Sequence, residues 1–159
     1  MKNKPGLGEL LRYVAELVDS GSAATYRDMT LDYRPRYTPI LRAMVSGACT
    51  VTEITGQTSL TQGAVSQSVS MMEQDGILIK SPLQDGRKSS LRLTEKGQQL
   101  ITVLQSHWET LFTAIDQLEK EIGYPLISVL QKTAGALERQ GFDERIRLAA
   151  NAQKGEQNG

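Results

Sequence analysis

The chain has 159 residues, with 18 basic and 18 acidic side chains and a formal net charge of zero. This length allows one domain, or one domain with dimerising extensions, and the neutral total gives no general signal for nucleic-acid binding. No apolar run approaches the length of a membrane span and the N-terminus leads into no signal-like apolar core, so we expect a soluble, cytoplasmic protein without membrane contact.

The composition also limits the chemistry. One cysteine, Cys49, and one histidine, His107, cannot assemble a zinc site of three or four nitrogen and sulfur ligands. The sequence has no G-x-S-x-G elbow, P-loop or dinucleotide fingerprint, so we expect no enzyme, no metal and no cofactor. We interpret Cys49 as a small buried hydrophobic residue in preference to a redox sensor. His107 is interpreted as a helix-surface residue in preference to a pH or ligand sensor.

The N-terminal segment predicts a helix over residues 6–19. Its apolar stripe comprises Leu7, Leu10, Leu11, Val14, Leu17 and Val18. Ser20-Gly21-Ser22 should end this helix, and in the next segment, residues 23–36, only a short helical turn near Tyr26 is expected.

A second helix is expected to begin at Thr38-Pro39. Thr38 would cap it, and Pro39 would occupy the first helical position, where a missing N–H costs nothing. Gly47 should end the helix. Its inward-facing residues should be Ile40, Leu41, Met44 and Val45.

Two more helices follow. Thr50 and Glu53 match a capping box in front of a very short apolar helix. Thr61 is the expected cap of the next, longer helix, and Ser59 with Gln62 is the alternative. A short helix, a turn with glycine and a longer helix form a helix-turn-helix signature.

The longer helix has two different faces. Val65, Val69 and Met72 recur at i, i+4 and i+7, so they should pack inward. The opposite face is polar and uncharged, with Gln62, Gly63, Ser66, Gln67 and Ser70. Such groups can meet base edges in a major groove, where glutamine can pair bidentately with adenine. For an isolated helix, simple exposure to water is the more common explanation of a polar face.

At Gly76 the hydrophobic period changes from helical to alternating, which indicates a helix leading into a hairpin. The first strand should span residues 77–80, and Leu91 and Leu93 alternate with polar residues in the second. The loop of residues 82–88 fits a long hairpin tip, so the pair is a candidate wing. Residues 77–97 contain five basic and two acidic side chains, a local charge of +3.

The C-terminal third contains the longest periodic run. Leu104, Trp108, Leu111, Ile115, Leu118 and Ile122 follow spacings of 4 and 3 residues, which is a heptad seam. Tyr124-Pro125 should turn the chain into another apolar helix, and Gly141 should separate it from a last helix over residues 142–152. Terminal helices with more apolar surface than one small domain buries imply a homodimer.

Together these residues resemble the winged-helix domain of the MarR-type family of bacterial transcription regulators. The resemblance covers roughly residues 38–105 and rests on four motifs, namely V65-S66, D75-G76-I77-L78, D85-G86-R87 and L91-R92-L93-T94-E95-K96-G97. It implies a mainly α fold with a small β wing, in which a winged helix-turn-helix core is flanked by N- and C-terminal dimerisation helices.

The resemblance also implies the DNA contacts. The recognition helix would present Thr61, Gln62, Gly63, Ser66, Gln67 and Ser70 to the major groove. At the wing tip Arg87 would enter the minor groove, oriented by Asp85 and accompanied by Lys88. Because residues 67–74 contain no basic side chain, phosphate contacts must come from elsewhere. The candidates are Arg34, Arg36 and Arg42, which ordinary surface exposure would explain equally well.

We therefore expect four regions: residues 1–37 as an N-terminal dimerisation helix and connector, 38–97 as the DNA-binding domain, 98–153 as dimerisation helices and 154–159 as a disordered tail. The expected function is that of a homodimeric transcriptional repressor that binds a pseudo-palindromic operator in double-stranded DNA. A small-molecule effector is compatible with this reading. The alternative is a winged-helix module that binds a protein partner, favoured by the neutral total charge and the lack of basic residues on the recognition helix.

Overall fold

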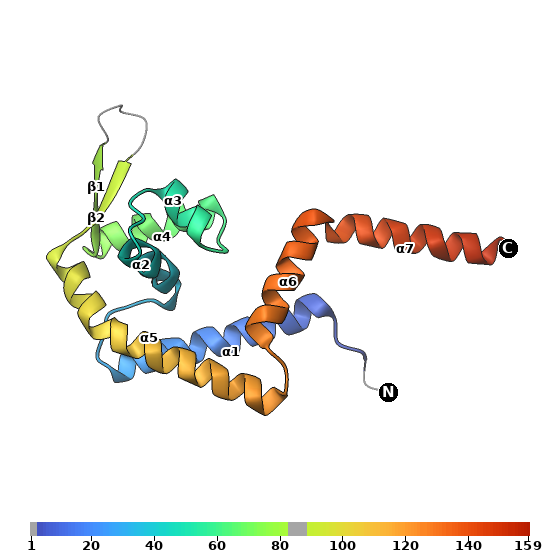
Figure 1. The fold of residues 1–159 in the computed structure, drawn as a ribbon, viewed down its shortest axis with the longest axis horizontal. Coiled ribbons are helices and arrows are strands. Elements are labelled where there is room, and N and C mark those ends of the chain that lie inside the picture. The colour runs from blue at the N-terminus through green and yellow to red at the C-terminus, as the bar shows by residue number, and fades with distance from the viewer. Residues whose placement is uncertain (1–2, 83–88) are drawn as a thin grey trace. The chain divides into compact units, whose positions relative to one another are not determined.

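A computed structural model describes residues 3–82 and 89–159 (Figure 1). The chain forms two compact units, Met1–Leu104 and Gln105–Gly159, which are described separately below. The described residues of the first unit form four helices, the beginning of a fifth, a 3-10 turn and a two-stranded antiparallel sheet. This agrees with the expected mainly α fold with a small β wing.

The first helix, α1, spans Leu7–Asp28 and is longer than the sequence indicates. The expected break at Ser20-Gly21-Ser22 is wrong, because the helix continues through it. A glycine in a helix costs only about 1 kcal/mol relative to alanine, an amount that packing elsewhere can exceed. The distal end of α1 supplies that packing, since Tyr26 is buried.

Beyond α1, a 3-10 turn called η1 (Pro35–Tyr37) leads directly into α2 (Thr38–Val45). Thr38 is the first residue of α2 and makes no capping hydrogen bond, contrary to expectation. Its hydroxyl instead lies 2.9 Å from the hydroxyl of Tyr33. Ile40 and Leu41 are buried as predicted. Two further expected core residues of α2 are not: Met44 is half-buried and Val45 is exposed.

The helix-turn-helix consists of α3 (Val51–Gln57) and α4 (Gln62–Gln74). Both predicted caps form, because the hydroxyl of Thr50 accepts from the Glu53 amide and that of Thr61 accepts from the Ala64 amide, each at 3.1 Å. The inward face of α4 is also confirmed, with Val65, Val69 and Met72 fully buried.

The wing follows α4 through Gly76, whose φ of 73° is in the left-handed region that favours glycine. Strand β1 (Leu78–Pro82) pairs with β2 (Ser89–Leu93) in a register that places Leu78 opposite Leu93 and Lys80 opposite Leu91. The hairpin is thus confirmed, although its first strand lies one to two residues later than predicted. In Figure 1 the two strands extend from the helix-turn-helix, and β1 contacts α4.

The long helix α5 (Glu95–Ile122) begins in the first unit and ends in the second. Its heptad residues Leu104 and Trp108 are buried, Leu111 and Ile115 are half-buried, and the last two, Leu118 and Ile122, are exposed. The seam is therefore covered only at its N-terminal end within one chain.

The second unit continues with α6 (Leu126–Arg139) and α7 (Phe142–Gln157). Helix α7 runs five residues past the predicted end and includes part of the segment 154–159 expected to be disordered, since its alanine, glutamine, lysine and glutamate residues favour helices. Phe142 and Ile146, predicted to face inward, are exposed. None of the described helices is long and apolar enough to cross a membrane.

Candidate nucleic-acid interface

The outward face of α4 carries the polar residues that the sequence singles out for base contact. Thr61, Gln62, Gly63, Ser66, Gln67 and Ser70 are all exposed. No basic residue lies within Gln62–Gln74. This surface offers uncharged hydrogen-bonding groups, which suit recognition of base edges better than neutralisation of phosphates.

One edge of this face borders a shallow depression of about 350 Å³ between α3, α4 and the wing. Its lining consists of Thr50, Val51, Thr52, Gln62, Ser66, Lys80, Ser89 and Leu91. Lys80 is exposed and brings positive charge to this edge. Lys80 was not among the predicted site residues; the sequence signal for it is its place in the basic stretch of residues 77–97.

The predicted wing-tip residues Asp85, Arg87 and Lys88 lie outside the described residues. Their roles remain predictions from the sequence. Of the basic residues on the described wing strands, Lys80 and Arg92 are exposed.

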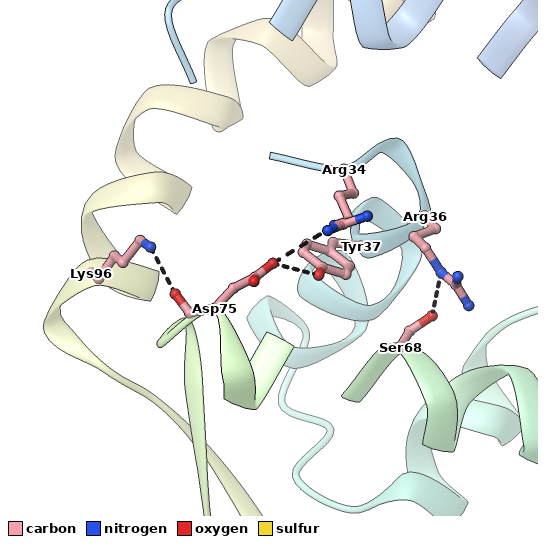
Figure 2. A network of polar contacts seen from close by, with 6 residues as sticks. All are labelled: Arg34, Arg36, Tyr37, Ser68, Asp75 and Lys96. Carbon is pink, nitrogen blue, oxygen red and sulfur yellow. Dashed lines mark hydrogen bonds and ion pairs between the residues drawn. The ribbon is translucent and has the colours of Figure 1, made fainter. Parts of the chain in front are cut away.

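The three arginines predicted as phosphate contacts are in different surroundings. Arg34 Nε lies 3.8 Å from Asp75 Oδ2, which ties the connector after α1 to the end of α4 (Figure 2). Arg36 donates from Nε to Ser68 Oγ and from Nη2 to Gln67 Oε1, both at 3.1 Å. Arg42 is exposed on α2. Two of the three side chains are therefore engaged with the recognition helix or its C-terminal end.

Asp75, the partner of Arg34, makes two further polar contacts (Figure 2). The buried Tyr37 donates its hydroxyl to Asp75 Oδ2 at 2.6 Å, and Lys96 of α5 donates to the Asp75 carbonyl at 2.7 Å. Desolvation, together with the hydrogen bond to Asp75 and its charge, raises the pKa of Tyr37 to about 12. The tyrosine stays neutral and acts as a donor over the physiological range.

A larger cavity of about 620 Å³ lies on the other side of α4, between α1, η1, α2 and the turn before α4. We call it the connector cavity, and its lining is Asp19, Ala23, Arg34, Pro35, Arg36, Pro39, Leu60, Ala64 and Ser68. Much of this lining is apolar; its charged residues are Arg34, Arg36 and Asp19, and Arg34 is also paired with Asp75. It adjoins Ser68, the residue of α4 that receives a hydrogen bond from Arg36.

Cys49 is exposed, so its interpretation as a buried residue is wrong. It follows the buried Ala48 at the entrance to α3, and its amide donates to Glu53 Oε2 at 2.7 Å. A hydrogen bond to Glu53 raises the pKa of the Cys49 thiol. Among the described residues, no group of three or more histidine, cysteine, aspartate or glutamate side chains could hold a metal ion.

Comparison with known proteins identifies the fold of this chain through solved structures and not through sequence. No protein-family model matches the chain, and no curated protein matches it by sequence. Solved structures do match. They include the transcriptional regulator MosR of M. tuberculosis in complex with DNA, at 16% identity with a TM-score of 0.69, covering 87% of this chain and 100% of that one.

Two other structures extend the comparison. The MepR–DNA complex of S. aureus is 18% identical with a TM-score of 0.64, over 84% of this chain and 99% of that chain. Bordetella bronchiseptica BpsR, whose DNA binding is regulated by 6-hydroxynicotinic acid, is 19% identical with a TM-score of 0.56, over 99% and 98%. The chain therefore shares the fold of these proteins over most of its length, and also that of a MarR/EmrR family transcriptional regulator from Acinetobacter sp. ADP1, which is 21% identical with a TM-score of 0.62 over 82% of this chain and 94% of that one.

Proposed function

We propose that this protein is a MarR-type transcriptional regulator that binds double-stranded DNA as a homodimer and represses the genes it controls. The observation that carries the proposal is the exposed, uncharged polar face of α4 beside a wing, in a fold shared with two proteins solved in complex with DNA. In this reading α4 enters the major groove and its exposed side chains read base edges.

Phosphate contacts come from residues outside α4. Lys80 and Arg92 on the wing strands and Arg42 on α2 are exposed cations on the first unit. Arg87 and Lys88 at the wing tip would add to them, with Asp85 orienting Arg87 in the minor groove. Arg34 and Arg36 serve first to hold the recognition helix, because each already contacts a residue of α4 or its end.

Homodimer formation is supported by apolar surface at both ends of the chain. The six leucine and valine residues of the N-terminal part of α1 are each at least 45% exposed. These residues are Leu7, Leu10, Leu11, Val14, Leu17 and Val18. In the second unit Leu118, Ile122, Ile127 and Leu130 are also exposed. A second copy of the chain would cover such surfaces, and a two-fold dimer would place two α4 helices about 34–36 Å apart to read a pseudo-palindrome.

A small anionic molecule is the effector that the connector cavity would suit. Arg34 and Arg36 supply positive charge there, and Pro35, Pro39 and Leu60 supply apolar contact. A ligand that engages Arg36 would compete with its hydrogen bonds to α4 and so alter the recognition helix. The regulation of BpsR by 6-hydroxynicotinic acid supports this type of control in the fold.

The test is a fluorescence titration of the purified protein with DNA flanking its own gene and with random duplex, each at two salt concentrations. We expect tighter binding to the flanking DNA and an affinity that falls steeply with salt, because neutralised phosphates release counterions. Arg42→Ala should reduce the salt slope by about one unit, whereas Ser66→Ala should leave the slope unchanged.

Equal and weak binding to both duplexes would contradict the proposal for this DNA. A selection from fully randomised duplex would then decide the question. Failure to enrich any sequence would reject sequence-specific DNA binding and favour a module that binds a protein partner.

A further inference from the structure

Arg36 links the turn η1 to two neighbouring residues of the recognition helix. Its Nε donates to Ser68 Oγ and its Nη2 donates to Gln67 Oε1, both at 3.1 Å. Figure 2 shows the Arg36 side chain of η1 pointing toward Ser68 on α4. Ser68 is buried at 3% exposure, so this end of the contact is anchored in the core. Gln67, by contrast, is exposed on the face proposed to read DNA.

The chemistry of the guanidinium determines which way the Gln67 amide faces. Arginine has five N–H donors and no acceptor, so it can hydrogen-bond only to the amide oxygen of a glutamine. Because Nε and Nη2 belong to one planar group, the bond to Ser68 also fixes the direction of the bond to Gln67. The Gln67 oxygen is therefore directed toward η1, and its NH₂ group remains as the outward hydrogen-bonding group.

The two glutamines of the recognition helix are consequently not equivalent. Residues 62 and 67 are five positions apart, which is roughly 500° of rotation and places them about 140° apart around the helix axis. Gln62 lies on the edge next to the wing, where it lines the depression with Lys80. Gln67 lies on the opposite edge, beside Arg36. Among the contacts within residues 3–82 and 89–159, Gln67 is the exposed residue of α4 that accepts from an arginine outside the helix.

We propose that Arg36 is a positioning residue that fixes Gln67 as a hydrogen-bond donor, so that this position of the recognition helix reads an acceptor edge in the major groove. Guanine presents two acceptors, N7 and O6, and no donor on this edge, whereas adenine places the N6 donor beside its N7 acceptor. The bidentate pairing of glutamine with adenine requires both an outward oxygen and an outward NH₂, and the contact with Arg36 opposes it. The proposal rests on the proposed function, because it assigns a base preference to the same face of α4.

The experiment is a selection from randomised duplex DNA, carried out in parallel with the full-length wild type, Arg36→Ala, Gln67→Ala and Gln67→Glu. The base pair whose preference is lost in Gln67→Ala marks the position that Gln67 reads. At that base pair we expect the wild type to favour guanine over adenine by about five- to tenfold, the low end of the discrimination seen for direct base contacts, because guanine offers the NH₂ group two acceptors and adenine only one. Arg36→Ala frees the amide and should allow adenine at least equally.

The Gln67→Glu variant provides the opposite perturbation. A carboxylate keeps the contact with Arg36 and offers the DNA no donor, so the preference for an acceptor edge should disappear. Gln62→Glu is its matched control, since it adds the same charge to the same helix on the other edge. Arg42→Ala is the control for Arg36→Ala, because it removes one cation from the same unit without removing the contact to Gln67. Both controls should weaken binding without changing preference at the Gln67 position.

The outcomes distinguish a failure of the proposed function from a failure of the positioning role of Arg36. If the wild type enriches no sequence, the proposed function is wrong and the base preference with it. If the wild type enriches a sequence but Arg36→Ala keeps the same preference, the positioning role is wrong and the function stands. A wild-type preference for adenine at the Gln67 position, or no position that depends on Gln67, would also overturn the inference. Circular dichroism of each variant confirms that the exposed substitutions leave the fold intact.

Discussion

Replacing Gly97 by alanine tests how closely the start of α5 packs against the entry to the wing. A Cβ at this position would collide with the carbonyl oxygen of Ile77 and lie 3.2 Å from a methyl group of Leu93. The carbonyl cannot easily retreat, because it accepts from the amide of Thr94 at 3.0 Å and from its hydroxyl at 3.1 Å. The same hydroxyl accepts from the Gly97 amide at 3.1 Å, so the helix start is held to the wing by this cluster.

Two opposing effects determine how much Gly97→Ala changes the free energy of unfolding. Alanine in place of glycine in a helix gains about 1 kcal/mol, whereas forcing an extra carbon into a packed site typically costs about 1–3 kcal/mol and sometimes more. Because the atom that must move at Gly97 belongs to the backbone, we expect the high end of that range and a net loss of about 2 kcal/mol. For a protein of this size the melting temperature should fall by about 4–8 °C.

Urea unfolding followed by circular dichroism at 222 nm measures this loss. All variants must be compared at one protein concentration, since association would make stability depend on it. Gly56→Ala in α3 is the matched control, because nothing lies within 4 Å of its added Cβ. It should leave stability unchanged or raise it by up to about 1 kcal/mol. If Gly97→Ala proved as stable as Gly56→Ala, the close approach of α5 to Ile77 would be wrong.

Three further predictions concern Tyr37 and Cys49. Tyr37→Phe removes the donor 2.6 Å from Asp75 Oδ2 and should lower the free energy of unfolding by about 1–2 kcal/mol in the same urea assay; an unchanged value would show that the contact contributes nothing. Burial and then Asp75 raise the pKa of Tyr37 to about 12, so its contribution is complete below the unfolded value near pH 10 and is lost as pH rises through 12. Stability measured from pH 9 to 12 should therefore fall less in Tyr37→Phe than in the wild type, and parallel profiles would contradict the assignment. A hydrogen bond to Glu53 raises the pKa of the Cys49 thiol, so iodoacetamide at pH 8 should modify Cys49 more slowly than it modifies free glutathione. The rate should be higher in Glu53→Gln than in the wild type, and equal rates in these two proteins would exclude the interaction.

Local rules were enough to predict the helix-turn-helix and the wing. Thr61 caps α4, and Val65, Val69 and Met72 are its buried face, because capping and the helical period act over a few residues and leave a direct trace in the sequence. The exit at Gly76 was predictable for the same reason, since a left-handed residue before a strand favours glycine.

Features that depend on distant contacts were not predictable in this way. The sequence suggests a break at Gly21, yet α1 continues to Asp28, where the buried Tyr26 packs edge-to-face on Tyr33 with ring centroids 4.7 Å apart. The contact of Arg36 with Gln67 joins residues 31 positions apart, and no periodicity in either segment indicates it. Its charge and its place just before α2 predict a phosphate contact for Arg36, or equally an ordinary surface charge, but not a contact with α4.

For the proposed function, the arrangement of charge on the first unit implies that affinity for DNA and selectivity among bases depend on different residues. Because α4 has no basic residue between Gln62 and Gln74, its contacts with DNA would be neutral hydrogen bonds that depend little on salt. The exposed cations Lys80 and Arg92 lie on the wing strands and Arg42 lies on α2, so the salt-dependent part of binding would come from elements that read no base in the major groove. Arg36 differs from these cations, since its charge is directed at the recognition helix itself. Its loss would therefore change which base is preferred more than how tightly DNA is held.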